Sequence, residues 1–186
     1  VDHTPKSPKK NTIWLEYKSG SKENSQHAIN KMVNLKSNGL LKFTQIQPFD
    51  NAFDSVLNSV KTASQVRHLI IRNSSLSVNH LQNVANVLKL NDGIAWLVLD
   101  HNKIDDRGVR HLADGIKKSS SVKHVVLADN EFGDNGLIAL SQAVKQSKSI
   151  ESLWLQGNKI GDIGADILAM NIENHVSLKT LDIRGN

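Results

Sequence analysis

The 186 residues are 39% hydrophobic and 22% charged, proportions that allow a buried core and exclude an intrinsically disordered chain. No window approaches the roughly 18 consecutive apolar residues that cross a bilayer, and no apolar segment follows the basic N-terminus as it does in a signal peptide. The chain contains no cysteine, which excludes disulfide bonds, thiolate metal ligands and a cysteine nucleophile and fits a reducing compartment. We therefore expect a cytoplasmic protein with no membrane partner, stabilised by packing alone.

The formal net charge of +5 is concentrated at the N-terminus. Residues 1–65 hold nine Lys and Arg against five Asp and Glu, whereas residues 66–186 hold fourteen against thirteen. Lys6, Lys9 and Lys10 stand among prolines, a composition typical of a solvated segment, so we assign residues 1–10 to a flexible basic tail. So few lysines release few counterions from phosphates, and we expect no nucleic-acid partner.

Residues 11–65 contain two weak copies of a 28-residue pattern that becomes regular from Val66 onward. Leu41 and Phe43 occupy its strand positions, and one repeat earlier these positions fall on Ile13 and Leu15. The helix positions of the two copies are filled by Ala28, Met32, Val56 and Val60. We interpret residues 11–65 as an N-terminal cap of degenerate repeats, because an end repeat needs a more polar outer face. A separate small domain is the alternative.

Residues 66–186 repeat every 28 residues without insertion. In each unit two apolar columns alternate with polar or variable positions, as expected of a short strand. The first column is Leu69, Leu97, Val125, Leu153 and Leu181, and the second is Ile71, Leu99, Leu127, Leu155 and Ile183. An asparagine follows each of three strands, at Asn102, Asn130 and Asn158, with Ser74 in its place in the first unit.

The second half of each unit predicts a helix. Gly108, Gly136 and Gly164 recur before apolar residues that lie four apart, such as Leu112 and Ile116, which is helical spacing. A strand and a helix within 28 residues, stacked without insertions, place parallel strands on one side and helices on the other. The predicted fold class is therefore α/β, a solenoid with a parallel β-sheet on its concave face and helices on its convex face.

The pattern LxxLxLxxNxLxxxGxxxLxxxL is carried by Leu97, Leu99, Asn102, Ile104, Gly108 and Leu112, and again by Leu153, Leu155, Asn158, Ile160, Gly164 and Leu168. It resembles the ribonuclease-inhibitor-type leucine-rich repeats over about two-thirds of the chain. The resemblance implies a horseshoe segment whose asparagines hydrogen-bond the turn backbone, with a concave sheet that binds a protein. The high Asn, Lys, Ser and Ile content also resembles that of leucine-rich-repeat effectors from intracellular bacteria such as Legionella, which would place the protein in a host cytosol.

Strand alternation turns the residues between the two apolar columns out onto the concave face. All three tryptophans of the chain, Trp14, Trp96 and Trp154, fall on such positions. Tryptophan buries a large area at low rotamer cost and is typical of binding hot spots. Two structural alternatives stay open, since Trp14 can pack inside the cap and the other two can lean over their strand neighbours.

The predicted binding surface has an apolar centre of Ile70, Val98 and Val126 between the tryptophans and a polar rim, the usual composition of a specific protein interface. Its full set of residues is Trp14, His68, Ile70, Arg72, Trp96, Val98, Asp100, His124, Val126, Trp154, Gln156, Asp182 and Arg184.

The sequence offers no catalytic or cofactor chemistry. His68 and His124 share one outward column but stand about 10 Å apart, too far to share a metal ion. Aspartates recur after the strands, at Asp105, Asp106, Asp134 and Asp162, where they are expected to cap the following turns. No glycine-rich phosphate loop, GxSxG elbow or HExxH helix is present. We predict a non-enzymatic protein without metal or cofactor.

Two functions fit this pattern. The first is a binding protein whose concave face holds another protein, an enzyme or another effector, and inhibits it. The second is a regulatory or sensor array within a larger receptor or scaffold. The sequence stops at Asn186, directly after the fifth strand, so an open sheet edge is expected there. Truncation of a longer chain, cover by a partner, or self-association through this edge would each account for it.

Overall fold

The computed structural model describes residues 13–18, 39–48 and 50–186, and of residues 13–16 it gives the backbone only. Its strands are β1 (Ile13–Lys18), β2 (Gly39–Thr44), β3 (Val66–Arg72), β4 (Trp96–Val98), β5 (His124–Val126), β6 (Ser152–Trp154) and β7 (Thr180–Asp182). Its helices are α2 (Asn51–Val60), α3 (Val78–Leu90), α4 (Asp106–Lys118), α5 (Asp134–Gln146) and α6 (Asp162–Ile172). The predicted basic tail and the helix positions Ala28 and Met32 lie outside the described residues.

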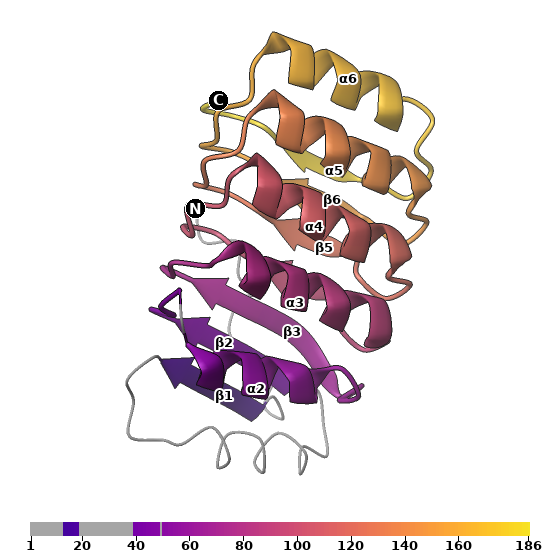
Figure 1. Cartoon of the computed structure of the whole chain (residues 1–186). Helices are drawn as coiled ribbons and strands as arrows, with labels where there is room; N and C mark the ends of the chain where they lie inside the picture. The colour runs from indigo at the N-terminus through magenta and orange to yellow at the C-terminus, as the bar shows by residue number, and fades with distance from the viewer. Residues whose placement is uncertain (1–12, 19–38, 49) are drawn as a thin grey trace.

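The seven strands form one parallel sheet in chain order, β1 to β7, and the helices stack along one side of it (Figure 1). Each helix follows its strand and returns the chain to the start of the next, so every repeat packs mainly against its two neighbours. This arrangement confirms the predicted α/β solenoid.

The 28-residue spacing holds from β2 onward. Leu41 pairs with Leu69 and Phe43 with Ile71, as the pattern predicts. At β1 the prediction is wrong by two residues, because Leu15 pairs with Leu41 and Tyr17 with Phe43. The Tyr17 side chain is buried at this end of the core. Its ring meets that of Phe43 edge-on at 5.9 Å between centroids, and its hydroxyl donates a hydrogen bond to the Asp50 carboxylate.

The main core lies between the sheet and the helices. Both predicted apolar columns of the strands are buried there as far as β6, together with helix residues such as Leu112, Ile116 and Leu140. Phe43, Phe53 and Phe132 are its largest fully buried side chains. At the β7 end the core opens, since Leu181 and Ile183 remain 38% and 37% exposed.

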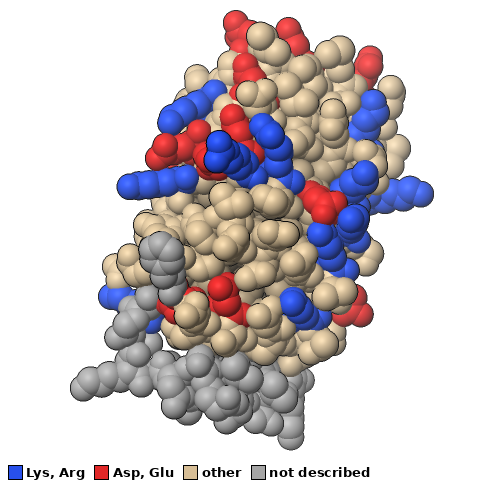
Figure 2. All heavy atoms as spheres, viewed as in Figure 1, with Lys and Arg blue, Asp and Glu red and all other residues tan. Residues whose placement is uncertain are grey.

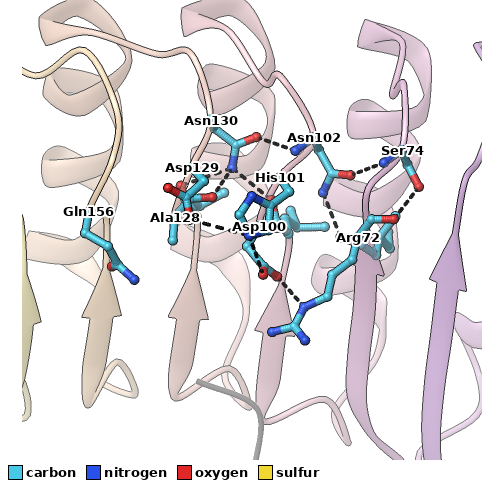
Figure 3. A network of polar contacts seen from close by, with 12 residues as sticks. Arg72, Ser74, Asp100, His101, Asn102, Ala128, Asp129, Asn130 and Gln156 are labelled. Carbon is cyan, nitrogen blue, oxygen red and sulfur yellow. Dashed lines mark hydrogen bonds and ion pairs between the residues drawn. The ribbon is translucent and has the colours of Figure 1, made fainter. Parts of the chain in front are cut away.

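Asparagine side chains join neighbouring repeats at the ends of the strands, as the resemblance implied (Figure 3). The Asn130 amide donates to the Leu99 carbonyl at 2.9 Å, and its oxygen accepts from the backbone of Asn102 and Ile104 at 3.1 and 3.0 Å. Ser74 takes over part of this role, because its hydroxyl accepts from the Ile46 amide at 3.0 Å. The substitution in the Asn column therefore keeps the link between repeats.

The residue before each position of the Asn column adopts a left-handed backbone conformation. These residues, with φ between 48° and 68°, are Gln45, Asn73, His101, Asp129, Gly157 and Gly185. They recur every 28 positions, so the strands β2 to β7 are followed by the same tight turn. Only two of the six are glycine, the residue that adopts this conformation at least cost, and for this reason composition did not reveal the turn.

Aspartates at the starts of helices connect repeats as well. Asp105 caps its own helix as predicted, accepting from the Gly108 amide at 2.9 Å. Asp106 instead reaches the next repeat, where its carboxylate accepts from the amides of Gly133 and Gly136 at 2.8 and 2.9 Å. Asp134 accepts from Gly161 in the same way at 2.7 Å. The expectation that these aspartates cap the turns that follow them was therefore wrong for Asp106 and Asp134, whose carboxylates bind the helix start of the next repeat.

Candidate protein-interaction surface on the concave face

The predicted site residues of β3 to β6 come together in two rows on the side of the sheet away from the helices. The first row pairs His68, Trp96, His124 and Ser152 across neighbouring strands. The second row pairs Ile70, Val98, Val126 and Trp154. Trp14 pairs with Leu40 and thus belongs to the first row, although the sequence pattern placed it in the second; its side chain lies outside the described residues.

Four aromatic side chains form a continuous stack on this face, which we call the aromatic shelf: His68, Trp96, His124 and Trp154. The Trp96 ring lies 4.0 Å from that of His124 and 5.8 Å from that of Trp154, measured between centroids. His68 stacks on the other side of Trp96 at 6.1 Å. Both tryptophans remain partly exposed and lie outside the main core. Both tryptophans therefore lean over their strand neighbours, as the structural alternative expected, and their rings face each other across β4 to β6.

The apolar centre is buried, contrary to the expectation that it would lie open. Ile70, Val98 and Val126 are each 1% exposed or less. Together with Leu40 and Ala128 they form a second buried cluster, against which both tryptophans pack. Leu40 and Ala128 were not predicted as members of this cluster. Both stand on outward columns of the strands, and an apolar residue at such a position is the sequence signal that identifies them.

The predicted polar rim is organised as ion pairs. Arg72 donates to Asp100 at 2.6 Å, and both side chains are largely buried (Figure 3). Arg184, two residues after the end of β7, contacts the carboxylate of Asp182 at 2.6 Å. Gln156 lies near the end of β6 with its side-chain oxygen buried. The charges of Arg72 and Asp100 neutralise each other. The main role of this pair is therefore to hold β3 and the end of β4 together, and it presents little net charge to a partner.

Burial shifts the titration of the histidines on the shelf. Desolvation lowers the pKa of His68 below its ordinary value of 6.5, and the nearby His124 lowers it further. The pKa of His124 is lowered mainly by desolvation, an effect that Glu151 opposes and that Lys123 and Lys179 reinforce. The Nδ1 atoms of both rings are buried and have no hydrogen-bond partner among the described residues. Both imidazoles are therefore neutral at pH 7, which suits their packing against tryptophan.

Two charged groups beside the shelf were not anticipated from the sequence. Glu151 accepts from Lys123 and Lys179 on the strand starts to either side, both at 2.8 Å, and these contacts lower its pKa to about 2. At the opposite ends of the strands, His101 lies 3.5 Å from Asp129 and 3.8 Å from Asp100.

The described residues contain no group of three or more His, Cys, Asp or Glu side chains placed to hold a metal ion. On the helix side, a groove of about 190 Å³ between α4 and α5 is lined by polar side chains such as Arg110, Lys117 and Gln142. Figure 2 shows Lys and Arg mixed with Asp and Glu over this face. Asp114, for example, contacts Lys89 and Lys118 at 2.6 and 3.1 Å. The groove between α4 and α5 is therefore polar and bordered by charges of both signs.

None of the described helices is both long and apolar enough to span a bilayer.

Comparison with known proteins supports the fold. Residues 118–141 and 146–169 match a family model described as Leucine Rich repeat. No curated protein matches the chain in sequence. The structure of Leiomodin-1 Actin-Binding Site 2 superposes with a TM-score of 0.65 at 19% identity, covering 71% of this chain and 79% of that one. The Caenorhabditis elegans tropomodulin C-terminal domain gives a TM-score of 0.56 at 16% identity, covering 87% and 83%. At such identities the likeness is one of fold, and this chain folds as a leucine-rich-repeat solenoid of seven parallel strands alternating with helices.

Proposed function

We propose that this protein is a non-enzymatic binding module that holds a protein partner on the aromatic shelf of its concave face. The observation that carries the proposal is the stack of His68, Trp96, His124 and Trp154, which is partly exposed and separate from the main core. Aromatic side chains at the centre of a surface supply most of the binding energy of typical protein interfaces, and polar groups around them exclude water.

The neighbouring charged groups support a protein partner rather than a small molecule. Arg72 with Asp100, and Glu151 with its two lysines, flank the shelf at opposite ends of the strands. A surface with an apolar middle and charged edges over several strands matches the extent of a protein footprint, since the shelf alone spans β3 to β6, or about 14 Å at the usual strand spacing.

The test is to compare binding by the wild type with binding by the Trp96→Ala/Trp154→Ala variant. Proteins retained from a lysate are identified by mass spectrometry, and the affinity of each candidate is then measured with purified components. We expect the double substitution to weaken a genuine partner at least about 30-fold, since two hot-spot tryptophans together carry 2 kcal/mol or more. Leu90→Ala, at the exposed end of α3, is the matched control and should leave the affinity unchanged.

Because both tryptophans pack against the second buried cluster, circular dichroism and thermal unfolding must accompany each binding measurement. A variant that unfolds gives no information on binding, and Trp96→Phe/Trp154→Phe then replaces it, because phenylalanine retains most of the apolar cover. A partner that binds the folded variant as tightly as the wild type would place the binding surface elsewhere.

Actin is a defined first candidate, because one structure of the same fold is that of an actin-binding site of leiomodin-1. Co-sedimentation with filamentous actin and gel filtration with monomeric actin test it directly, with the tryptophan variant as the control.

Three finer hypotheses have narrower support. Inhibition of the partner follows from the ribonuclease-inhibitor resemblance, and the role of a bacterial effector in a host cytosol rests on composition alone. A regulatory or sensor array in a larger protein fits the exposed apolar residues of the last repeat, such as Ile163, Met170 and Val176. Identification of a partner by the experiment above separates these hypotheses, because each implies a different class of protein.

A further inference from the structure

The end of the solenoid formed by α6 and β7, opposite β1 in the stack (Figure 1), exposes positions that the repeats from β3 to β6 bury. Leu181 and Ile183 are 38% and 37% exposed, whereas Leu153 and Leu155, one repeat earlier, are fully buried. Ala169 on α6 is exposed as well, although the small residues at its position in α3, α4 and α5 are buried. The end repeat of a solenoid ordinarily has a polar outer face, and this one has the contact face of an internal repeat.

The outer edge of β7 presents backbone groups to a further strand. The Asp182 carbonyl accepts from the Leu155 amide at 2.7 Å, so the peptide groups of Asp182 face β6. Because the direction of the hydrogen bonds alternates along a strand, the peptide groups of Leu181 and Ile183 point to the opposite edge. Among the described residues no strand lies beyond that edge. An eighth parallel strand would meet it in the register that joins β6 to β7.

Two exposed aspartates on α6 hold positions that contact the next helix in earlier repeats. Asp162 is equivalent to Asp134, whose carboxylate accepts from a backbone amide at the start of the next helix at 2.7 Å. Asp166 is equivalent to Asp54, which accepts a hydrogen bond at 2.9 Å from a side chain of α3. Both aspartates on α6 are exposed. The outer face of α6 thus keeps the acceptors with which a repeat binds the helix that follows it.

Glu173, directly after α6, reverses the charge that its position carries in other repeats. Lys89 of α3 and Lys145 of α5 hold this position, and they contact Asp114 and Asn171 of the next helix at 2.6 and 3.3 Å. Because α6 itself contains no lysine or arginine, its outer face is acidic. A helix packed against it is therefore expected to place a basic side chain opposite Glu173, at the position that Asp114 holds toward Lys89.

We propose that this end of the solenoid docks one further leucine-rich repeat, which continues the 28-residue spacing and presents a basic side chain to Glu173. Its strand extends the sheet beyond β7, its apolar columns cover Leu181 and Ile183, and the amides at the start of its helix bind Asp162. A second copy of the chain meeting through the same face is disfavoured, because the carboxylates of the two α6 helices would repel each other. The inference goes beyond the proposed function, since this surface lies at the edge of the sheet and not on the aromatic shelf.

The test adds to the full chain a copy of its own residues 103–130 directly after Asn186, where the copy keeps the spacing of the repeats. Two versions of the copy differ at one residue, since one keeps Asp114 and the other carries Asp114→Lys. Hydrogen exchange is followed by NMR at the amides of Leu181 and Ile183. We expect exchange at both amides to slow at least about tenfold in the lysine version, and by a smaller factor in the aspartate version.

Three matched variants control the comparison. Glu173→Lys in the host chain reverses the charge of the surface and should make the aspartate version the better protected one. A single serine inserted before the copy shifts its register by one residue, turns its apolar columns to the other face of the strand and should remove the protection. A copy of residues 131–158, with and without Gln142→Lys, repeats the measurement on a second sequence if the first copy does not fold.

Unchanged exchange at Leu181 and Ile183 in both in-register extensions would overturn the proposal. Protection that does not reverse with Glu173→Lys would refute the assignment of a basic side chain to the docked repeat. Analytical ultracentrifugation of the unextended chain tests the remaining occupant, because a dimer in which the same two amides are protected would make a second copy the occupant instead. None of these measurements involves the aromatic shelf, so the proposed function is tested separately.

Discussion

Replacement of Asn130 by alanine tests whether the asparagine ladder holds neighbouring repeats together. The side chain is 6% exposed and makes five hydrogen bonds to backbone groups of two repeats. The Leu127 carbonyl keeps a second donor from Asn158 at 2.9 Å, so the main loss falls on the amides of Asn102 and Ile104. A buried donor left without an acceptor costs about 1–3 kcal/mol, and we expect Asn130→Ala to lower the free energy of unfolding by about 2–6 kcal/mol.

The assay is urea denaturation followed by circular dichroism, with the midpoint and slope fitted for each variant. Asn135→Ala is the matched control, since this asparagine is exposed at the start of α5, and a surface substitution should change the free energy by less than about 0.5 kcal/mol. A loss below about 1 kcal/mol for Asn130→Ala would refute the reasoning, because water would then satisfy the backbone groups as well as the amide does.

Three further predictions use the same denaturation assay. Burial lowers the pKa of His68 and His124, so below pH 6.5 the unfolded chain binds more protons than the folded chain. The free energy of unfolding should therefore fall as the pH drops from 7 toward 5, and it should fall less in the His68→Gln/His124→Gln variant. Equal pH dependence in the two chains would contradict this prediction. A Cβ at Gly115 would lie 2.7 Å from the backbone of α3, so Gly115→Ala should cost about 1–3 kcal/mol, and a stabilised variant would mean that the helices can move apart freely. Arg72→Met removes the guanidinium that contacts the largely buried Asp100 at 2.6 Å and should lower the free energy of unfolding by about 2–4 kcal/mol. Adding Asp100→Asn should restore much of this stability. If the losses from the two substitutions simply add, the two groups are not coupled.

The repeat pattern in the sequence was sufficient to predict the solenoid. The two apolar columns recur every 28 residues, and the same spacing sets the strand register from β2 to β7. At β1 the pattern failed, because Ile13, Leu15 and Tyr17 alternate with outward residues. A slip of two residues keeps all three on the same face of the strand, so hydrophobicity alone cannot choose between the registers. The contact of Tyr17 with Phe43 and Asp50 in the folded chain decides it.

The sequence also identified the concave rows and their tryptophans, since alternation along a strand fixes which side chains point outward. The tertiary structure decided how those side chains meet. The stacking of His124 on Trp96 depends on ring orientation, and the burial of Val98 depends on what covers it; neither follows from strand periodicity. The reach of Asp106 into the next repeat likewise depends on how closely two helix starts approach. Periodicity thus determined the fold and the candidate face. The form of the site was determined by contacts between repeats, because such contacts depend on distances across the stack of repeats and not on spacing along the chain.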